Sequence, residues 1–245
     1  MSKIPNKAVL FTAYDRIGYL ARTLDSWRNV RGLEDWYFYA SVDPSQHSQA
    51  IVDLFAQFTR DTGLSFHSTH LNDRKLGVLH HPWRGFEDLF NNGMEFVVRV
   101  EDDLPVSDDF LEYMDWSRKE FQDNEDIAAV IGYQSDFQGD EGAVLIQEGF
   151  SPWNWGIWKD RWDYYIRDTW DHDYTTYNGQ PGHQSGFDWN LNTRVLPERG
   201  KSCVYPAQSR VQNIGEHGTH ARASDFPQSA SFHEHYGPVE YRLVK

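Results

Sequence analysis

Three consecutive carboxylates, Glu101, Asp102 and Asp103, directly follow an apolar stretch that runs from Phe96 to Val100. Mutual repulsion makes such a cluster costly unless a cation or hydrogen-bond donors neutralise it. Carboxylate oxygens suit a hard divalent ion such as Mn²⁺ or Mg²⁺, and such an ion can bridge to a diphosphate. Alternation along an extended chain would direct Glu101 and Asp103 to one side and Asp102 to the other. The triplet predicts a metal site, with a solvated acidic loop as the alternative.

Asp188 is a candidate general base. It lies between Phe187 and Trp189, whose apolar bulk would raise the pKa of its carboxyl toward a useful value. The alternative is an N-cap role at the start of a short helix. Two histidines further along, His217 and His220, lie three residues apart among glycines. A histidine in such a loop is either a metal ligand or a hydrogen-bonded surface residue.

Six of the ten tryptophans fall between residues 153 and 189. Trp153 and Trp155 are candidate stacking surfaces for a sugar or for a nucleic-acid base. Trp158, Trp162 and Tyr165 follow at helical spacing, which favours the buried stripe of a helix. The block therefore predicts a pocket wall at Trp153 and Trp155, followed by residues that belong to the core.

The elements that must position these residues alternate between strands and helices. Predicted strands cover residues 8–13, 36–42, 64–70, 96–100 and 127–131, and predicted helices cover 17–27, 51–62, 78–90 with an interruption at Pro82, and 108–121. Such alternation indicates right-handed βαβ units and a mostly parallel sheet, in which ligands bind at the carboxyl ends of the strands. The polar residues that follow the first, second and fourth strands would meet there. No glycine-rich phosphate loop follows any strand, which argues against a dinucleotide-dependent oxidoreductase and a P-loop NTPase.

Beyond about residue 135 the periodicity fades. We therefore expect one domain, residues 1–245, with two halves: residues 1–135 form a nucleotide-type α/β half, and residues 136–245 form a more irregular, aromatic-rich half that closes over it.

The 245 residues include 37 acidic and 23 basic side chains, a net charge of −14. This charge argues against a protein held on nucleic acid by bulk electrostatics. Cys203 is the only cysteine, which excludes an internal disulfide framework and a cysteine-based zinc site. No run approaches the roughly 18 apolar residues of a membrane span, and the first residues lack the pattern of a signal peptide. We expect a soluble, cytoplasmic protein without stable membrane insertion.

Several segments resemble GT-A glycosyltransferases, and most closely family 13, the N-acetylglucosaminyltransferase I type. Residues 96–113 resemble the segment that carries the E-D-D form of the D-x-D motif. Further likenesses occur in the same order along the chain, at residues 9–16, 40–43, 73–77, and 187–210. They correspond to the first strand with its A-x-D-R turn, the end of the second strand, an H-R-K-x-x-G stretch and the block around the catalytic base. The likeness runs intermittently over residues 8 to 220.

The resemblance implies a GT-A fold and a set of donor contacts. Asp103 would coordinate Mn²⁺ (or Mg²⁺), and Glu101 and Asp102 would contact the ribose and sugar of the donor. The nucleobase would be framed by Tyr14, Asp15, Arg16 and Asp43. Arg74 or Lys75 would reach the base or the phosphates.

The resemblance also implies that residues 1–135 bind the nucleotide-sugar and that residues 136–245 bind the acceptor, with Trp153 and Trp155 as its stacking surfaces. In this second half, Asp188 would deprotonate the acceptor hydroxyl for an inverting displacement. The spacing around it departs from the family, so other acids stay open as substitutes: Asp163, Asp168, Asp171 and Asp173. His220 would be a further metal ligand. The family's eukaryotic members carry an N-terminal membrane anchor that this sequence lacks, which favours a microbial or viral relative.

The sequence therefore predicts a metal-dependent transferase of the hexosyl type. It would move a sugar from a nucleotide-sugar, a UDP-sugar being preferred, to a hydroxyl acceptor with inversion. A glycan is the default acceptor, and a hydroxylated base of viral DNA is the first alternative. The second alternative is a carbohydrate-binding protein without catalysis.

Overall fold

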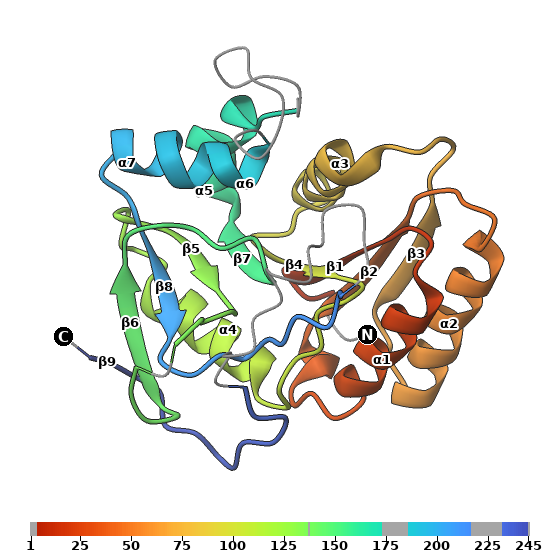
Figure 1. Ribbon diagram of the computed structural model, residues 1–245, viewed down its shortest axis with the longest axis horizontal. Coiled ribbons are helices and arrows are strands. Elements are labelled where there is room, and N and C mark those ends of the chain that lie inside the picture. The colour runs from red at the N-terminus through yellow and green to blue at the C-terminus, as the bar shows by residue number, and fades with distance from the viewer. Residues whose placement is uncertain (1–3, 137, 173–185, 217–231, 245) are drawn as a thin grey trace.

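The computed structural model describes residues 4–136, 138–172, 186–216 and 232–244. Over these residues nine strands form one sheet in the order β3-β2-β1-β4-β7-β5-β8-β6-β9 (Figure 1). The strands are β1 (Lys7–Ala13), β2 (Tyr37–Val42), β3 (His67–Leu71), β4 (Phe96–Glu101), β5 (Ile127–Ile131), β6 (Ala143–Gln147), β7 (Trp155–Trp158), β8 (Ser202–Pro206) and β9 (Arg242–Leu243).

Helices connect the strands and cover both faces of the sheet. The longer ones are α1 (Ile17–Trp27), α2 (Ser48–Thr62), α3 (Gly77–Asn91) and α4 (Phe110–Glu120). The shorter α5 (Lys159–Arg161) continues into a π-helical stretch at Trp162–Ile166 and a 3₁₀ turn at Arg167–Thr169. A second π-helical stretch, Leu191–Val195, joins α6 (Phe187–Asn190) to α7 (Leu196–Glu198), and a further 3₁₀ turn lies at Leu33–Asp35.

Two apolar cores result from this layering. On one face α1, α2 and α4 pack through side chains such as Trp27, Phe55 and Phe110. On the other face α3 packs with the helical segments that follow β7, through Phe86 and Trp162 among others. Figure 1 shows α3 together with α5, α6 and α7 on one side of the sheet and α1, α2 and α4 on the other. Alternate residues of the buried strands supply each core, as the period of two requires.

The parallel half confirms the predicted alternation. β1 pairs in parallel with both β2 and β4, and β2 pairs in parallel with β3. The helix 78–90 is one continuous α3, with Pro82 in its first half, so the predicted interruption is wrong. β3 begins three residues later than expected and is largely exposed, because it lies at the edge of the sheet.

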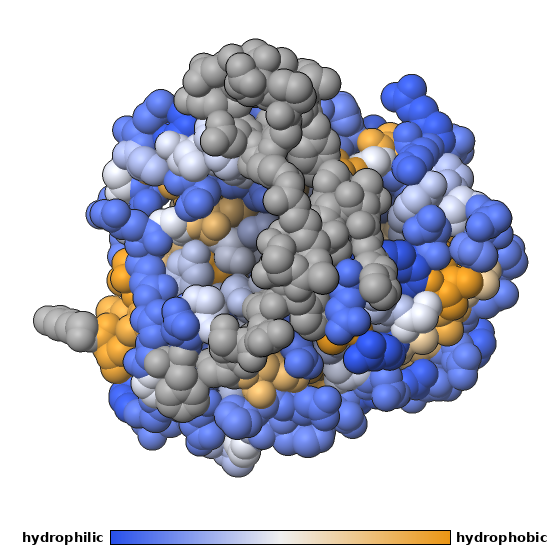
Figure 2. Space-filling view, in the orientation of Figure 1, coloured by the Kyte–Doolittle hydropathy of each residue, from blue (hydrophilic) through white to orange (hydrophobic). Residues whose placement is uncertain are grey.

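The second half is more regular than the sequence suggested. β7 is antiparallel to both β4 and β5, and β6 is antiparallel to β8. Strand β7 therefore lies between the two halves of the sheet and joins them. Figure 2 shows a mostly hydrophilic face with an apolar patch at the edge over β6 and β9, the strands that carry the exposed Ile146 and Leu243.

Candidate functional site

The carboxyl ends of β2, β1 and β4 lie side by side, since these strands are adjacent and parallel. Ala13 pairs with Val42 and Thr12 pairs with Glu101, so the residues that follow each strand emerge at the same edge. The structure thus brings together Tyr14, Asp15 and Arg16, Asp43, and the acid triplet. This gathering follows from local strand ends plus parallel pairing, as the sequence predicted.

Arg16 is the partner of the last two acids. Its Nη1 donates to Oδ2 of Asp103 at 2.6 Å, and its Nη2 and Nε donate to the Asp102 carboxylate. Glu101 instead accepts a hydrogen bond from Arg99 Nη1 at 2.9 Å. The expected alternation is wrong: the extended chain ends at Glu101 and turns, so Asp102 and Asp103 both face Arg16. We call residues 101–104 the acid turn.

Burial dominates the electrostatics of the acid turn. It raises the pKa of Asp102 to about 7, opposed by the charge of Arg16 and reinforced by Asp103. Burial also raises the pKa of Glu101, with Arg99 acting in the opposite direction. Burial lowers the pKa of Arg16, but the carboxylates of Asp102 and Asp103 outweigh this and raise it overall. The acid turn therefore needs a cation, and Arg16 supplies one within the chain.

The acid turn supplies only some of the ligands that a divalent ion needs. Among the residues that the structure describes, no group of three or more His, Cys, Asp or Glu side chains is arranged to hold a metal. An ion that binds a diphosphate takes one or two carboxylates, with phosphate oxygens and waters as the other ligands. The Asp103 carboxylate fits that role. The histidine candidates, His217 and His220, lie outside the described residues.

Asp43 has a different environment from the one expected of a base-contacting carboxylate. It is buried, and its oxygens accept hydrogen bonds from Asn72 Nδ2 at 2.9 Å and from the backbone amides of Leu76 and Gly77. His81 follows in the same helix, 3.8 Å from the carboxylate. The carboxylate thus holds the start of α3, and its oxygens are turned toward protein groups.

The loop between β3 and α3 lies against the turn that follows β1. The Lys75 ammonium is 3.8 Å from the centre of the Tyr14 ring, a cation–π contact. Arg74 and Asp15 are exposed. The structure therefore places the exposed Lys75 directly on Tyr14, with the exposed Arg74 beside it in the chain. Both lie next to the edge of the sheet where the acid turn lies.

Asp188 lies in the first turn of α6 and is partly buried. Its neighbour Phe187 stacks on Trp170, with ring centroids 4.1 Å apart and planes 6° apart. The Arg99 guanidinium is 5.5 Å from the centre of the Phe187 ring. Since Arg99 also binds Glu101, one buried arginine connects the start of α6 to the acid turn.

The structure describes three of the four substitute acids. Asp163 is exposed and pairs with Lys159 on the surface. Asp168 is exposed, Asp171 accepts a hydrogen bond from the Gly186 amide at 3.3 Å, and Asp173 lies outside the described residues. Asp188 stays the preferred candidate for the base, as predicted from the sequence.

The two candidate stacking tryptophans differ sharply in environment. Trp155 is 0% exposed, with Phe86 and Phe150 packed on its ring, so the prediction that it stacks on an acceptor is wrong. Its position in β7 directs it into the core between the sheet and α3. Trp153 is partly exposed and contacts the Tyr133 ring edge-to-face, with centroids 4.4 Å apart. Trp158, Trp162 and Tyr165 are buried, as predicted. They do not form one helical stripe, because Trp158 ends strand β7 and only Trp162 and Tyr165 lie in the π-helical stretch.

Three residues near the acid turn were not predicted from the sequence to belong to the site. Arg99 carried a signal, because a cation within an otherwise apolar strand must find a partner. Asn154 binds the backbone at both ends of the turn, and Gly215 lies so close to Asp103 that a Cβ there would be 2.1 Å from Oδ2. Neither residue carried a sequence signal.

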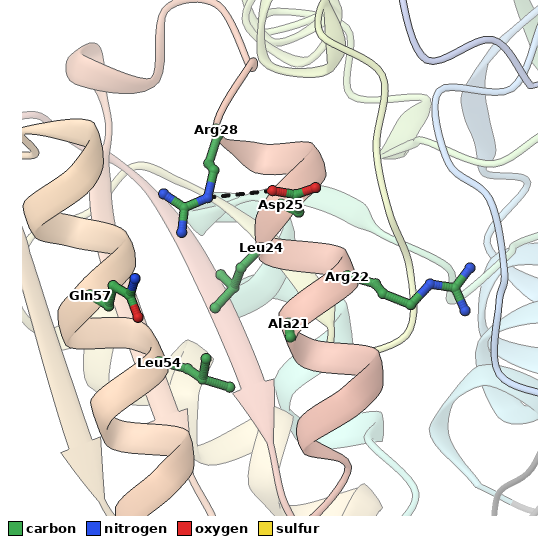
Figure 3. A pocket seen from close by; sticks show the side chains of 7 residues that line it. All are labelled: Ala21, Arg22, Leu24, Asp25, Arg28, Leu54 and Gln57. Atoms are coloured by element: carbon green, nitrogen blue, oxygen red, sulfur yellow. Dashed lines mark ion pairs between the residues drawn. The ribbon is translucent and has the colours of Figure 1, made fainter.

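One pocket lies away from this edge. It has a volume of about 280 Å³ and lies between α1 and α2, with Leu24 and Leu54 on opposite sides and the Asp25–Arg28 ion pair at one end (Figure 3). Arg16 precedes the opposite end of α1 and does not line it. The pocket is therefore separate from the acid turn.

Comparison of the sequence with models of known protein families and with curated proteins gives no match. Solved structures do match the fold. The mannosyltransferase PcManGT from Pyrobaculum calidifontis, in complex with GDP-Man and Mn²⁺, has a TM-score of 0.56 at 12% identity over 84% of this chain and 55% of its own. GalNAc-T7 with UDP, GalNAc and Mn²⁺ has a TM-score of 0.60 at 9% identity over 92% and 46%. This chain has the GT-A fold. TarS 1–349 from S. aureus is similar too, with a TM-score of 0.55 at 11% identity over 86% of this chain and 60% of its own.

The GT-A assignment concerns the fold. The chain spans about half the length of the solved structures it resembles. In the described part of the chain, no helix is both long and apolar enough to cross a bilayer.

Proposed function

We propose that this protein is a metal-dependent glycosyltransferase that moves a hexose from a nucleotide-sugar, a UDP-sugar, to an acceptor hydroxyl. The observation that carries the proposal is the acid turn at the carboxyl end of β4, with Arg16 bound to Asp102 and Asp103. Its support is the GT-A fold, since neighbours of that fold have been solved with GDP-Man and Mn²⁺ and with UDP, GalNAc and Mn²⁺.

Donor binding would use the edge where β1, β2 and β4 end. Asp103 would hold Mn²⁺ or Mg²⁺, with His220 as a second ligand, and the bound ion would offset the charge of the leaving diphosphate. Glu101 and Asp102 would accept hydrogen bonds from hydroxyl groups of the ribose and the sugar.

The nucleobase and the phosphates would meet the turn after β1 and the loop before α3. Tyr14 offers an aromatic face, with Asp15 and Arg16 beside it. Lys75 and Arg74 supply positive charge for the diphosphate. Asp43 would contribute by holding the start of α3 rather than by touching the base, because its oxygens already accept hydrogen bonds from the chain.

Asp188 would act as the general base. Its carboxylate takes the proton of the acceptor hydroxyl while that oxygen bonds to the anomeric carbon from the face opposite the nucleotide. The bond to the diphosphate breaks, and the diphosphate leaves with the electron pair. The product carries the inverted configuration.

The acceptor would be a glycan that lies against the partly exposed Trp153. A net charge of −14 disfavours a DNA acceptor, because a polyanion would be repelled. Nothing in the site favours a carbohydrate-binding protein without catalysis, which would not require the buried acid turn.

The test is release of nucleotide diphosphate from a panel of nucleotide-sugars, with and without Mn²⁺. We expect release from one UDP-sugar that depends on Mn²⁺ and is lost in Asp103→Ala. Asp123→Ala, a change at an exposed acid outside the site, is the matched control and should release as the wild type does. Absence of binding and of release with every donor would refute the transferase, and glycan binding would then be measured in the absence of metal and nucleotide.

A further inference from the structure

Asn154 has a left-handed backbone conformation, which few residues other than glycine adopt. With φ at 47°, it is the only non-glycine residue with a positive φ in the ranges that the structure describes. Glycine adopts this left-handed conformation without a steric cost, whereas asparagine adopts it less readily. Asn154 is also 0% exposed. A position that favours glycine but carries a fully buried amide indicates that the side chain has a task.

The contacts of the side chain define that task. Oδ1 of Asn154 accepts a hydrogen bond from the Glu101 amide at 3.2 Å, and Nδ2 donates to the carbonyl of Leu104 at 3.1 Å. One primary amide thus bridges the first and last residues of the acid turn. An aspartate would lose the donor and a leucine would lose both groups, so asparagine matches this pair of partners in type and length.

Strand pairing brings Asn154 to the turn. Trp155 pairs with Arg99 across the antiparallel β4–β7 ladder, so Asn154 lies where that ladder ends and the acid turn begins. Its backbone carbonyl accepts a hydrogen bond from the Gly132 amide at 2.8 Å. A Cβ at Gly132 would be only 2.7 Å from that carbonyl, so the close approach requires glycine. Asn154 is therefore fixed from its own backbone as well as from its side chain.

The loop before β7 contacts the acid turn a second time, through Arg99. Arg99 Nη1 donates to the carbonyl of Pro152 at 3.4 Å and to Glu101 at 2.9 Å. The loop before β7 thus controls the direction of the Glu101 side chain through Arg99 and the backbone of the turn through Asn154.

We propose that Asn154 is a positioning residue: its amide holds the acid turn in the shape that directs Asp102 and Asp103 together toward one cation. In the structure that cation is Arg16. The proposal rests on the proposed function, because in the active protein the same shape would present Asp103 to the divalent ion that binds with the nucleotide. It adds a residue from the second half of the chain to a site otherwise built from the first.

Three variants of the full-length chain test it. Asn154→Gly keeps the backbone conformation and removes both hydrogen bonds. Asn154→Asp keeps the acceptor for the Glu101 amide and removes the donor. Gln208→Ala is the matched control, because Gln208 is another buried amide with hydrogen bonds of its own, to Gly139 and Tyr236, outside the acid turn.

Two readouts separate positioning from general loss of stability. The first is hydrogen exchange at the Glu101 amide, followed by NMR, which we expect to be at least ~10-fold faster in Asn154→Gly and unchanged in Gln208→Ala. The second is binding of Mn²⁺ in the presence of UDP, followed by the electron paramagnetic resonance of the free ion. We expect at least ~10-fold weaker binding in Asn154→Gly, an intermediate value in Asn154→Asp, and wild-type binding in Gln208→Ala.

The outcomes are distinguishable. Wild-type exchange at Glu101 or wild-type Mn²⁺–UDP binding in a folded Asn154→Gly would overturn the positioning role and leave the transferase intact. Equal loss of binding in Gln208→Ala would also overturn it. If the wild-type protein itself binds no Mn²⁺ with UDP or any other nucleotide, the proposed function fails and this inference fails with it.

Discussion

Replacing Arg16 by methionine tests the electrostatics of the acid turn directly. In the wild type, Arg16 binds two carboxylates whose side chains are only 5% and 12% exposed. Methionine preserves most of the length of the side chain and removes the charge. Asp102 and Asp103 would then lie next to each other in a buried position with their shared cation gone.

The magnitude follows from the geometry. Removing one partner of a buried ion pair costs about 3–5 kcal/mol. The Arg16 side chain is 28% exposed, so water screens part of the interaction. We therefore expect the free energy of unfolding to fall by roughly 2–3 kcal/mol at pH 8.

The loss should depend on pH with a defined sign. Burial already raises the pKa of Asp102 to about 7 with Arg16 present, and removal of Arg16 raises it further. A carboxyl whose folded pKa exceeds its unfolded value of about 3.9 destabilises the fold increasingly as the pH rises from that value through the folded pKa. The difference between Arg16→Met and wild type should therefore be largest at pH 8 and smaller at pH 5.

The assay is urea unfolding followed by tryptophan fluorescence at pH 5 and pH 8, with and without Mn²⁺. Mn²⁺ should stabilise Arg16→Met more than it stabilises the wild type, because the ion replaces the missing charge. Arg22→Met, at an exposed arginine in helix α1, which begins directly after Arg16, is the control. A variant as stable as wild type at pH 8, or a loss of equal size at both pH values, would refute this account.

Three further predictions concern stability and are measured by urea unfolding. His81 is buried, and burial lowers the pKa of its imidazole to about 4 from an ordinary 6.5. The free energy of unfolding should therefore fall by up to ~3 kcal/mol as the pH drops from 6.5 to 4. A His81→Gln variant with the same pH profile as the wild type would contradict this prediction. Arg210 and Asp109 form a fully buried ion pair, so Arg210→Met should cost about 3–5 kcal/mol, and adding Asp109→Asn should restore part of it. No recovery in the double variant would argue that packing, and not the unpaired charge, causes the loss. Burial alone would raise the pKa of Asp115, but hydrogen bonds and charges, first that of the Lys119 ammonium, outweigh burial and lower this pKa to about 2. The carboxylate therefore stabilises the fold above pH 3.8 and loses that effect as the pH falls through 2, so Asp115→Asn should cost ~2 kcal/mol at pH 7 and almost nothing at pH 2. A loss of stability that is independent of pH would exclude this mechanism.

The sequence by itself determined the parallel half of the fold. Short apolar runs such as Phe96–Val100 and the 3.6-residue spacing of the first two helices are local properties, so they predict elements without knowledge of the partners. Because parallel strands end at one edge, the same information also predicted that Asp43, Arg16 and the acid triplet would gather there. The burial of Trp162 and Tyr165 followed from helical spacing in the same way.

Only the tertiary structure decided which partners the side chains at this edge of the sheet bind. The chain turns at Glu101, so Asp102 and Asp103 share Arg16 instead of alternating, and the carboxylate of Asp43 is directed into the start of α3. Neither direction is encoded in the spacing of the residues, because each depends on groups 30 or more positions away in the chain.

The contribution of the second half was likewise decided by tertiary pairing. The antiparallel insertion of β7 between β4 and β5 buries Trp155 and brings Asn154 to the acid turn. Four residues of an aromatic-rich segment carry too weak an alternation to specify a strand, its direction or its partners. Long-range packing of both sheet faces fixed that choice, and with it the shape of the candidate site.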